Sequence, residues 1–253
     1  MTKKMSRKAR AKMMARRRKR VKTGAILLTI LVIIFSIYNS NRKEKYQSAE
    51  TATYNKPNKI DKCIVIDAGH GGTEEPGCIF ENIYEKNICL QIAEKLQSKL
   101  EKEYEKVVMT RTEDVNVYLN ERARIANREN ADIFVSIHLN SLENDTVTSG
   151  IETWYNPTKD TESKVLAQNI QDSIIESTGA NDIGIKDNNG LIVTKNTEMP
   201  SCLVEAGFLS STEERKKLTN DNYQNKIVEG IYNGIKTYFE QSEDNKNQDG
   251  NNV

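Results

Sequence analysis

Apolar and polar positions follow two different periods along most of the chain after residue 60. Short apolar runs, which are typical of buried strands, are one pattern. They lie at 63–67, 106–110, 132–138, 151–155, 191–194 and 201–205. Apolar residues that recur every three or four positions are the other pattern and predict amphipathic helices. These helices are predicted over about 85–100, 117–130, 162–177 and 223–239. Strands that alternate with such helices indicate an α/β domain with a largely parallel sheet.

The remaining segments have other compositions. Residues 1–22 hold 12 Lys or Arg and no acidic residue, and an apolar run from Ala25 to Tyr38 follows them. A basic block before an apolar segment predicts an export signal or anchor whose tip stays in the cytoplasm. We expect a basic cytoplasmic tip at 1–22, a transmembrane anchor or signal segment at 23–40, a linker at 41–60, a single folded domain at 61–240 and a disordered polar tail at 241–253.

Two outcomes stay open for the apolar segment. Its 14-residue run is shorter than the roughly 20 residues that span a bilayer, although Lys22 can extend the reach by snorkelling. No pair of small residues marks a cleavage site near 35–41. The protein is expected at the outer face of the cytoplasmic membrane with its N-terminus inside, or in secreted form if the signal is cleaved.

Charge and cysteine content narrow the functional classes. Of 37 basic residues, 12 lie in the tip, which leaves 25 basic against 36 acidic residues in the rest. A basic block can also bind nucleic acid, but its place directly before an apolar segment favours the membrane, and we expect no nucleic-acid partner. The four cysteines share no C-x-x-C spacing, which argues against a zinc ribbon and leaves their disulfide state open.

The chain has two histidines, and each lies at the end of a predicted strand. His70 lies in the glycine turn of CIVIDAGHGG, and His138 ends DIFVSIH. Because ligands gather at the carboxyl ends of strands in open α/β sheets, the two imidazoles are expected at one edge. Either histidine alone is more often structural, but the pair favours a metal site. A catalytic zinc needs about three protein ligands.

Two glutamates can complete such a site. Glu85 opens the helix that follows the His70 loop, where the helix dipole also favours an acid. Glu205 closes the apolar strand SCLVE, where partial desolvation raises the pKa of a carboxyl group and suits a base. From the residues alone, either glutamate can be the ligand and the other the base.

Four motifs together carry a resemblance. The segments IVIDAGHGG, EKN, FVSIHLN and PSCLVEAGFLS stand in this order within about 62–239. They resemble the zinc-dependent N-acetylmuramoyl-L-alanine amidases of bacterial cell-wall turnover. The resemblance implies a mixed sheet of about six strands flanked by helices. It also implies one Zn²⁺ held by His70, Glu85 and His138, with Glu205 as the general base.

The reaction that the resemblance implies is hydrolysis of the amide between N-acetylmuramic acid and L-alanine in peptidoglycan. Zinc would polarise the carbonyl, and Glu205 would pass a proton from water to the leaving amine. A secreted form would then reside in the cell wall. Two alternatives are a related zinc carboxypeptidase acting on wall peptides and a non-catalytic, membrane-tethered wall-binding protein. An activating protein partner is compatible with the sequence, although no residue identifies one.

Four further residues are weaker candidates. Asp67 is expected to orient His70 or to cap the turn after the strand. Asn140 is expected to contact substrate or to shape the following turn. Arg111 and Arg122 are expected to pair with stem-peptide carboxylates or to be solvated. The glycines of the turn are expected to keep the metal's open face accessible to a bulky polymer, and the short segment 139–150 lacks the helical insertion that blocks the site in some family members.

Overall fold

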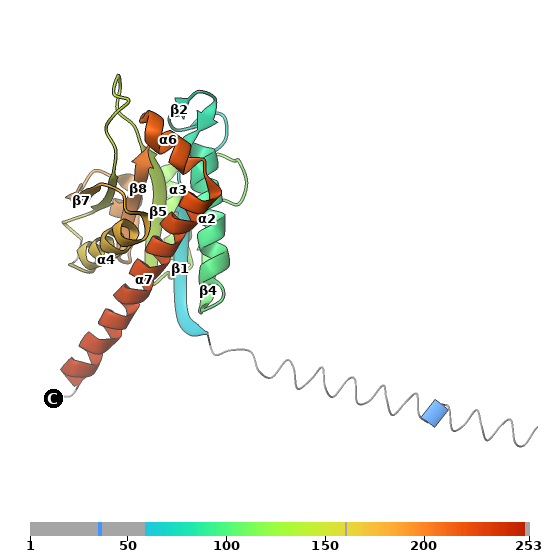
Figure 1. The fold of residues 1–253 in the computed structure, drawn as a ribbon. Helices are drawn as coiled ribbons and strands as arrows, with labels where there is room; N and C mark the ends of the chain where they lie inside the picture. Colours follow the sequence, from blue (N-terminus) through green and yellow to red (C-terminus); the bar gives the residue numbers. More distant parts are fainter. Residues whose placement is uncertain (1–34, 37–58, 160, 251–253) are drawn as a thin grey trace, which may run out of the picture. The chain divides into compact units, whose positions relative to one another are not determined.

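One six-stranded mixed sheet forms the centre of the fold (Figure 1). The computed structural model describes residues 35–36, 59–159 and 161–250. In spatial order the strands are β4 (Tyr104–Met109), β1 (Ile60–Ala68), β5 (Ile133–Asn140), β8 (Ser201–Phe208), β6 (Ile151–Tyr155) and β7 (Asp182–Asp187). The first four are parallel to one another, whereas β6 runs antiparallel to β8 and parallel to β7. The prediction of a mixed sheet of about six strands is confirmed.

Helices cover both faces of the sheet. The larger apolar cluster joins one face to α2 (Glu85–Leu100), α4 (Thr161–Thr178) and α7 (Asp221–Gly250). A smaller cluster joins the other face to α3 (Leu119–Arg128) and α5 (Ile192–Asn196). Successive residues of β1 alternate between them, so Ile64 belongs to the first cluster and Val65 to the second. Burial on both faces explains the continuous apolar runs of the parallel strands.

Helices α4 and α7 approach each other closely because two glycines of α7 lie at their contact. A Cβ atom on Gly234 would lie 2.5 Å from Ile170 Cα, and one on Gly230 would collide with the Ile174 backbone. Both isoleucines are fully buried. The glycines therefore set how near these two helices can come.

Two predictions about the elements were wrong, and one strand of the sheet was missed. The β-branched run at 191–194 forms part of the short helix α5, because Val193 and Thr194 are buried beside α3 as a helical turn. The strand β7 was missed, since DIGIKD is half-exposed and contains glycine. The segment from 241, predicted to be disordered, continues α7 to Gly250, with no proline or earlier glycine after Phe239 to end the helix.

Two other short elements were not foreseen. The loop predicted between Ala68 and Tyr84 contains a small hairpin of β2 (Ile79–Phe80) and β3 (Ile83–Tyr84). Helix α6 (Thr212–Leu218) follows β8. No helix within the described residues is long and apolar enough to cross a membrane. The predicted segment at 23–40 lies outside those residues except for 35–36.

Candidate metal centre

The loop after β1 holds His70 in an unusual backbone conformation. His70 has a φ of 58°, and Gly71 and Gly72 also have positive φ, at 139° and 69°. The left-handed region disfavours residues with a Cβ, although histidine visits it more often than most. The carbonyl of His70 accepts a 2.7 Å hydrogen bond from Arg122 Nη2, and the amide of Gly72 donates to Asp114 Oδ1 at 2.8 Å. These bonds stabilise the turn that presents the imidazole.

Three side chains from separate elements converge beside this turn and form a candidate metal site, called the metal centre and defined as His70, Glu85 and His138. His70 comes from the loop after β1, Glu85 from the first turn of α2, and His138 from β5. His70 Nε2, Glu85 Oε1 and His138 Nδ1 lie 3.1 Å from one another in all three pairings. Tetrahedral zinc with bonds of about 2.0–2.1 Å separates its ligand atoms by about 3.3–3.4 Å. The donor atoms therefore fit a zinc ion closely.

Glu85 is held in its ionised form. Its side chain is buried, Oε1 accepts a hydrogen bond from the Leu139 amide at 3.0 Å, and Oε2 accepts one from the Cys78 amide at 2.9 Å. Burial raises the pKa of Glu85, but the hydrogen bonds and charges of His138 and His70 outweigh burial and hold the pKa below its ordinary value. The carboxylate is thus charged and fixed in orientation.

Two glycines make room for these ligands. A Cβ atom on Gly69 would lie 2.5 Å from His138 Cε1, and one on Gly77 would lie 2.5 Å from Glu85 Oε2. We expected the glycines of the turn to keep an open face accessible. At Gly69 of the turn, and at Gly77 beyond it, the absent side chain leaves space for His138 and Glu85.

Glu205 lies beside the metal centre on the neighbouring strand. The parallel register of β5 and β8 pairs it with His138, so both side chains leave the same face of the sheet. Its Oε2 atom is buried and has no hydrogen-bond partner among the described residues. Burial, followed by the charges of Glu85 and Glu152, raises the pKa of Glu205 well above its ordinary value. The group therefore has the higher proton affinity that a general base requires.

Glu152 is a carboxylate beside the site that sequence reasoning missed. It is buried and lies opposite Glu205 in the antiparallel pairing of β6 with β8. Its Oε1 accepts hydrogen bonds from Asn140 Nδ2 at 2.7 Å and from Trp154 Nε1 at 3.1 Å. An acid near the start of the apolar strand IETWY was the available signal. Asn140 also accepts a hydrogen bond from the Ser141 amide. Its side chain therefore connects β5 to β6 through Glu152 and shapes the turn after β5.

Asp67 does not touch His70 directly. Its carboxylate accepts hydrogen bonds from Thr110 Oγ1 at 2.6 Å, from Ser136 Oγ at 2.6 Å and from Arg122 Nη1 at 2.7 Å. Arg122 in turn donates to the His70 carbonyl. The aspartate thus acts on the turn through the arginine, a link that neither expectation for Asp67 included.

Both weakly predicted arginines are buried, which contradicts the two expectations for them. Arg111 is 4% exposed and Arg122 is 1% exposed. Arg111 donates to the carbonyls of Ala68, Gly69 and Lys86 at 2.9, 2.8 and 2.7 Å. Guanidinium groups that are used in this way hold the site loop and are neither solvated nor free to pair with a substrate carboxylate.

Comparisons with known proteins agree with this geometry. The family model described as N-acetylmuramoyl-L-alanine amidase matches residues 64–237. The YqiI protein of Bacillus subtilis is 37% identical over 71% of this chain and 86% of its own. The crystal structure of an N-acetylmuramoyl-L-alanine amidase from Clostridium difficile 630 has a TM-score of 0.69 and 41% identity, over 71% of this chain and 97% of that one.

A further solved neighbour is the CwlD amidase of Clostridioides difficile, determined in complex with the GerS lipoprotein. It has a TM-score of 0.67 and 34% identity, over 71% of this chain and 99% of its own. The family match covers the sheet from β1 to β8 and all four residues of the metal centre and its neighbouring base candidate. This chain therefore belongs to the N-acetylmuramoyl-L-alanine amidase family.

Proposed function

We propose that the chain hydrolyses the amide bond between N-acetylmuramic acid and L-alanine in peptidoglycan with one Zn²⁺ held by His70, Glu85 and His138. Glu205 is the general base in this proposal. The observation that carries it is the 3.1 Å triangle of donor atoms beside a buried carboxylate oxygen that has no partner among the described residues.

The residues divide the chemical work between them. A zinc ion bound at the metal centre supplies Lewis acidity, which polarises a carbonyl and lowers the pKa of a water ligand. Glu205, with its raised pKa, takes a proton from the attacking water and delivers it to the leaving amine. Glu85, with its lowered pKa, stays ionised and binds metal. The opposite shifts of the two glutamate pKa values support these different roles.

Substitution of the base and of a ligand tests the assignment. Glu205→Gln is expected to retain one zinc per chain and to lose about 10²- to 10⁴-fold in activity. His138→Ala is expected to lose both zinc and activity, and the exposed Glu176→Gln serves as a control with neither loss. Zinc content and hydrolysis of purified peptidoglycan are measured together. Loss of zinc in Glu205→Gln with retention in Glu85→Ala would reverse the two roles.

The bond that is cleaved distinguishes an amidase from a wall carboxypeptidase. A carboxypeptidase needs a cation for the terminal carboxylate, and the two arginines considered for contacts of that kind are buried and bonded to backbone carbonyls. Mass spectrometry of digested peptidoglycan should therefore show intact stem peptides released from glycan. Release of single amino acids would contradict the amidase reaction. No release at all, with zinc absent, would favour the non-catalytic wall-binding alternative.

We further propose that residues 23–40 place the enzyme at the outer face of the cytoplasmic membrane, with secretion to the wall as the alternative. The support is the basic block of 1–22 before an apolar run. Detection of the full-length chain in the membrane fraction would support an anchor, and a shortened chain in the medium would contradict it. The neighbour solved with a lipoprotein also supports a proposal that this chain has a protein partner, testable by crosslinking in cells.

A further inference from the structure

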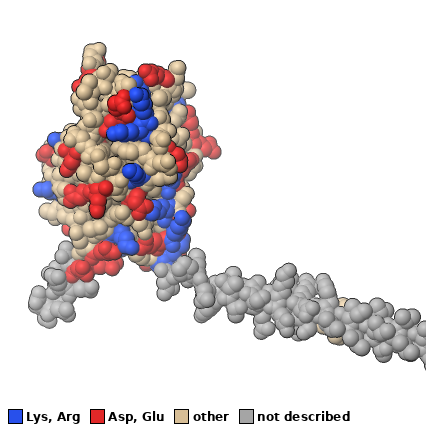
Figure 2. Space-filling model, viewed as in Figure 1, with Lys and Arg blue, Asp and Glu red and all other residues tan. Residues whose placement is uncertain are grey.

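A hollow with basic lining lies outside the metal centre, where the C-terminal end of α4 meets α6 and the first turns of α7. Its volume is about 460 Å³, within the range of roughly 300–1,000 Å³ common for small-molecule pockets. We call it the basic pocket and define it by Thr178, Lys216, Lys217, Tyr223 and Lys226, while Glu213, Asn220 and Asn222 complete its lining. Figure 2 shows basic side chains gathered over α6, beside acidic ones.

The lysines of the basic pocket are not equivalent. Lys216 pairs with Glu213 at 2.8 Å, one turn earlier on the exposed side of α6. Lys217 and Lys226 make no ion pair with any residue that the structure describes. Both are exposed. The lining thus holds three lysines against one acid, Glu213, although Lys217 also lies within electrostatic reach of Glu213 and Glu214. This local charge suits an anion.

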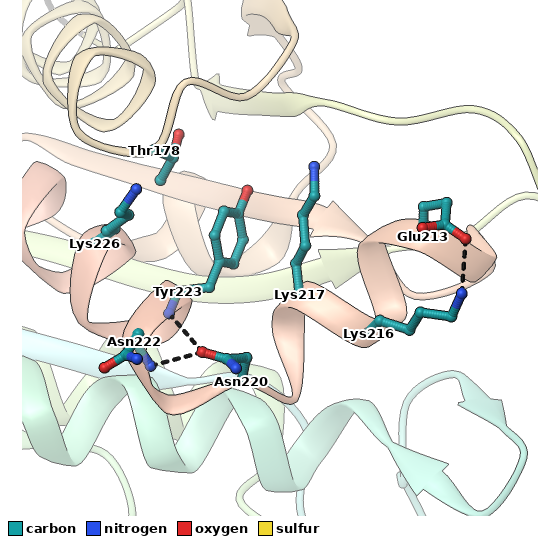
Figure 3. A pocket seen from close by; sticks show the side chains of 8 residues that line it. All are labelled: Thr178, Glu213, Lys216, Lys217, Asn220, Asn222, Tyr223 and Lys226. Atoms are coloured by element: carbon teal, nitrogen blue, oxygen red, sulfur yellow. Dashed lines mark hydrogen bonds and ion pairs between the residues drawn. The ribbon is translucent and has the colours of Figure 1, made fainter.

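The polar groups of the pocket stand in a row. Figure 3 shows Lys226, Tyr223 and Lys217 pointing to the same side, toward the end of α4 where Thr178 lies. Burial and then the charge of Glu214 raise the pKa of Tyr223 to about 12, against a smaller lowering by a hydrogen bond with the Thr178 side chain. The hydroxyl stays protonated, with Thr178 as its neighbour in the pocket. A hydroxyl donor between two ammonium groups offers successive contacts along one direction. A single small ion would use only part of that row.

We propose that the basic pocket binds the phosphate groups of a phosphodiester-linked anionic polymer. Compact ammonium groups and a hydroxyl bind phosphate as point contacts, and their row along one direction matches successive phosphates of a chain. The volume of about 460 Å³ is many times the roughly 30 Å³ that one water occupies. A chain of phosphates fills it better than a free ion. The pocket would tether the enzyme to such a polymer independently of the reaction at the metal centre.

The test compares binding of poly(glycerol phosphate) by full-length variants in calorimetric titrations. Lys217→Ala/Lys226→Ala is expected to bind at least tenfold more weakly, and the dependence of log K on log salt should become less steep. Tyr223→Phe should weaken binding by about two- to tenfold. Lys164→Ala, an exposed lysine near the opposite end of α4, is the control and should bind as the wild type does. The basic tip of residues 1–22 can bind the polymer as a second site. It is the same in every variant, so the two sites are fitted separately and only the affinity of the pocket is compared.

Three results would overturn the proposal. Unchanged affinity in the double variant would show that the pocket does not bind the polymer. An equal loss in Lys164→Ala, or equally tight binding of polyglutamate with matched charge, would show unspecific attraction to lysines. Hydrolysis of a soluble muropeptide should be unchanged in the double variant, which also verifies its fold. If that variant does not fold, Lys217→Gln and Lys226→Gln are compared singly, and each should weaken binding several-fold.

Discussion

At the scale of single residues, the metal centre depends on buried cations that no sequence motif marks. His70 and His138 could be recognised because they are the two histidines of the chain and both lie at strand ends. The burial of Arg111 and Arg122 could not be predicted. Most of their hydrogen-bond partners are backbone carbonyls of the loop after β1, and the path of that loop depends on the positive φ values of the turn. A sequence therefore identifies the residues that can take part in chemistry more readily than the residues that hold those side chains in position.

Arg122→Met is expected to destabilise the fold by about 3–5 kcal/mol at pH 7, because it leaves Asp67 charged, buried and without its counterion. In the wild type, burial raises the pKa of Asp67, but Arg122, Ser136 and Thr110 together lower it below its ordinary value. The charged carboxylate then stabilises the fold above about pH 3.9, and this contribution is lost as pH falls through the lowered pKa.

The same variant should reverse the sign of this pH dependence. Without Arg122, burial raises the folded-state pKa of Asp67, and stability falls as pH rises above about 3.9. Urea unfolding at pH 7 and pH 4 should show a deficit that shrinks at the lower pH. The double variant Asp67→Asn/Arg122→Met should show a deficit that does not depend on pH. An equal deficit at both pH values in the single variant would contradict this account.

At the scale of elements, periodicity located the four long helices and five of the six sheet strands. It was wrong where a segment is short, since four residues at 191–194 read equally as a strand or as a helical turn, and only burial beside α3 decides. Only Ile183 and Ile185 are apolar in β7, and this pattern is too short to indicate a strand. Sequence also gave no sign of how closely α4 and α7 approach.

Gly234→Ala should destabilise the protein, although alanine favours a helix over glycine by about 1 kcal/mol. The new Cβ would lie 2.5 Å from Ile170 Cα, so α7 must move away from α4, at a cost of about 1–3 kcal/mol or more. Asn225→Ala, on the exposed side of the same helix, is the control and should change stability by less than about 0.5 kcal/mol. A stabilised Gly234→Ala in thermal unfolding would show that the helices are not in close contact.

At the scale of the whole molecule, zinc would connect three elements that are distant in sequence. His70 follows β1, Glu85 begins α2 and His138 lies in β5, and all three belong to one compact unit of sheet and helices. A ligand that binds only the folded chain stabilises it by an amount that grows with its concentration. The metal is therefore expected to act on stability as well as on catalysis.

Free zinc at 100 times its dissociation constant should stabilise the fold by about 2.7 kcal/mol, seen as a higher midpoint of thermal unfolding. A chelator should remove this increment together with activity. His138→Ala should show no zinc-dependent change in its midpoint, since it lacks one of the three proposed ligands. A zinc effect of equal size in that variant would place the stabilising ion elsewhere in the protein.

The reversed direction of β6 has a consequence for how such enzymes change over time. Because β6 runs antiparallel to β8, segment 141–150 enters it at the edge where Glu152 lies opposite Glu205. Chain inserted there would be added beside the catalytic edge without shifting the register of any strand. Insertion or deletion in segment 141–150 can thus add or remove chain that covers the site. Access to the site can therefore evolve separately from its chemistry.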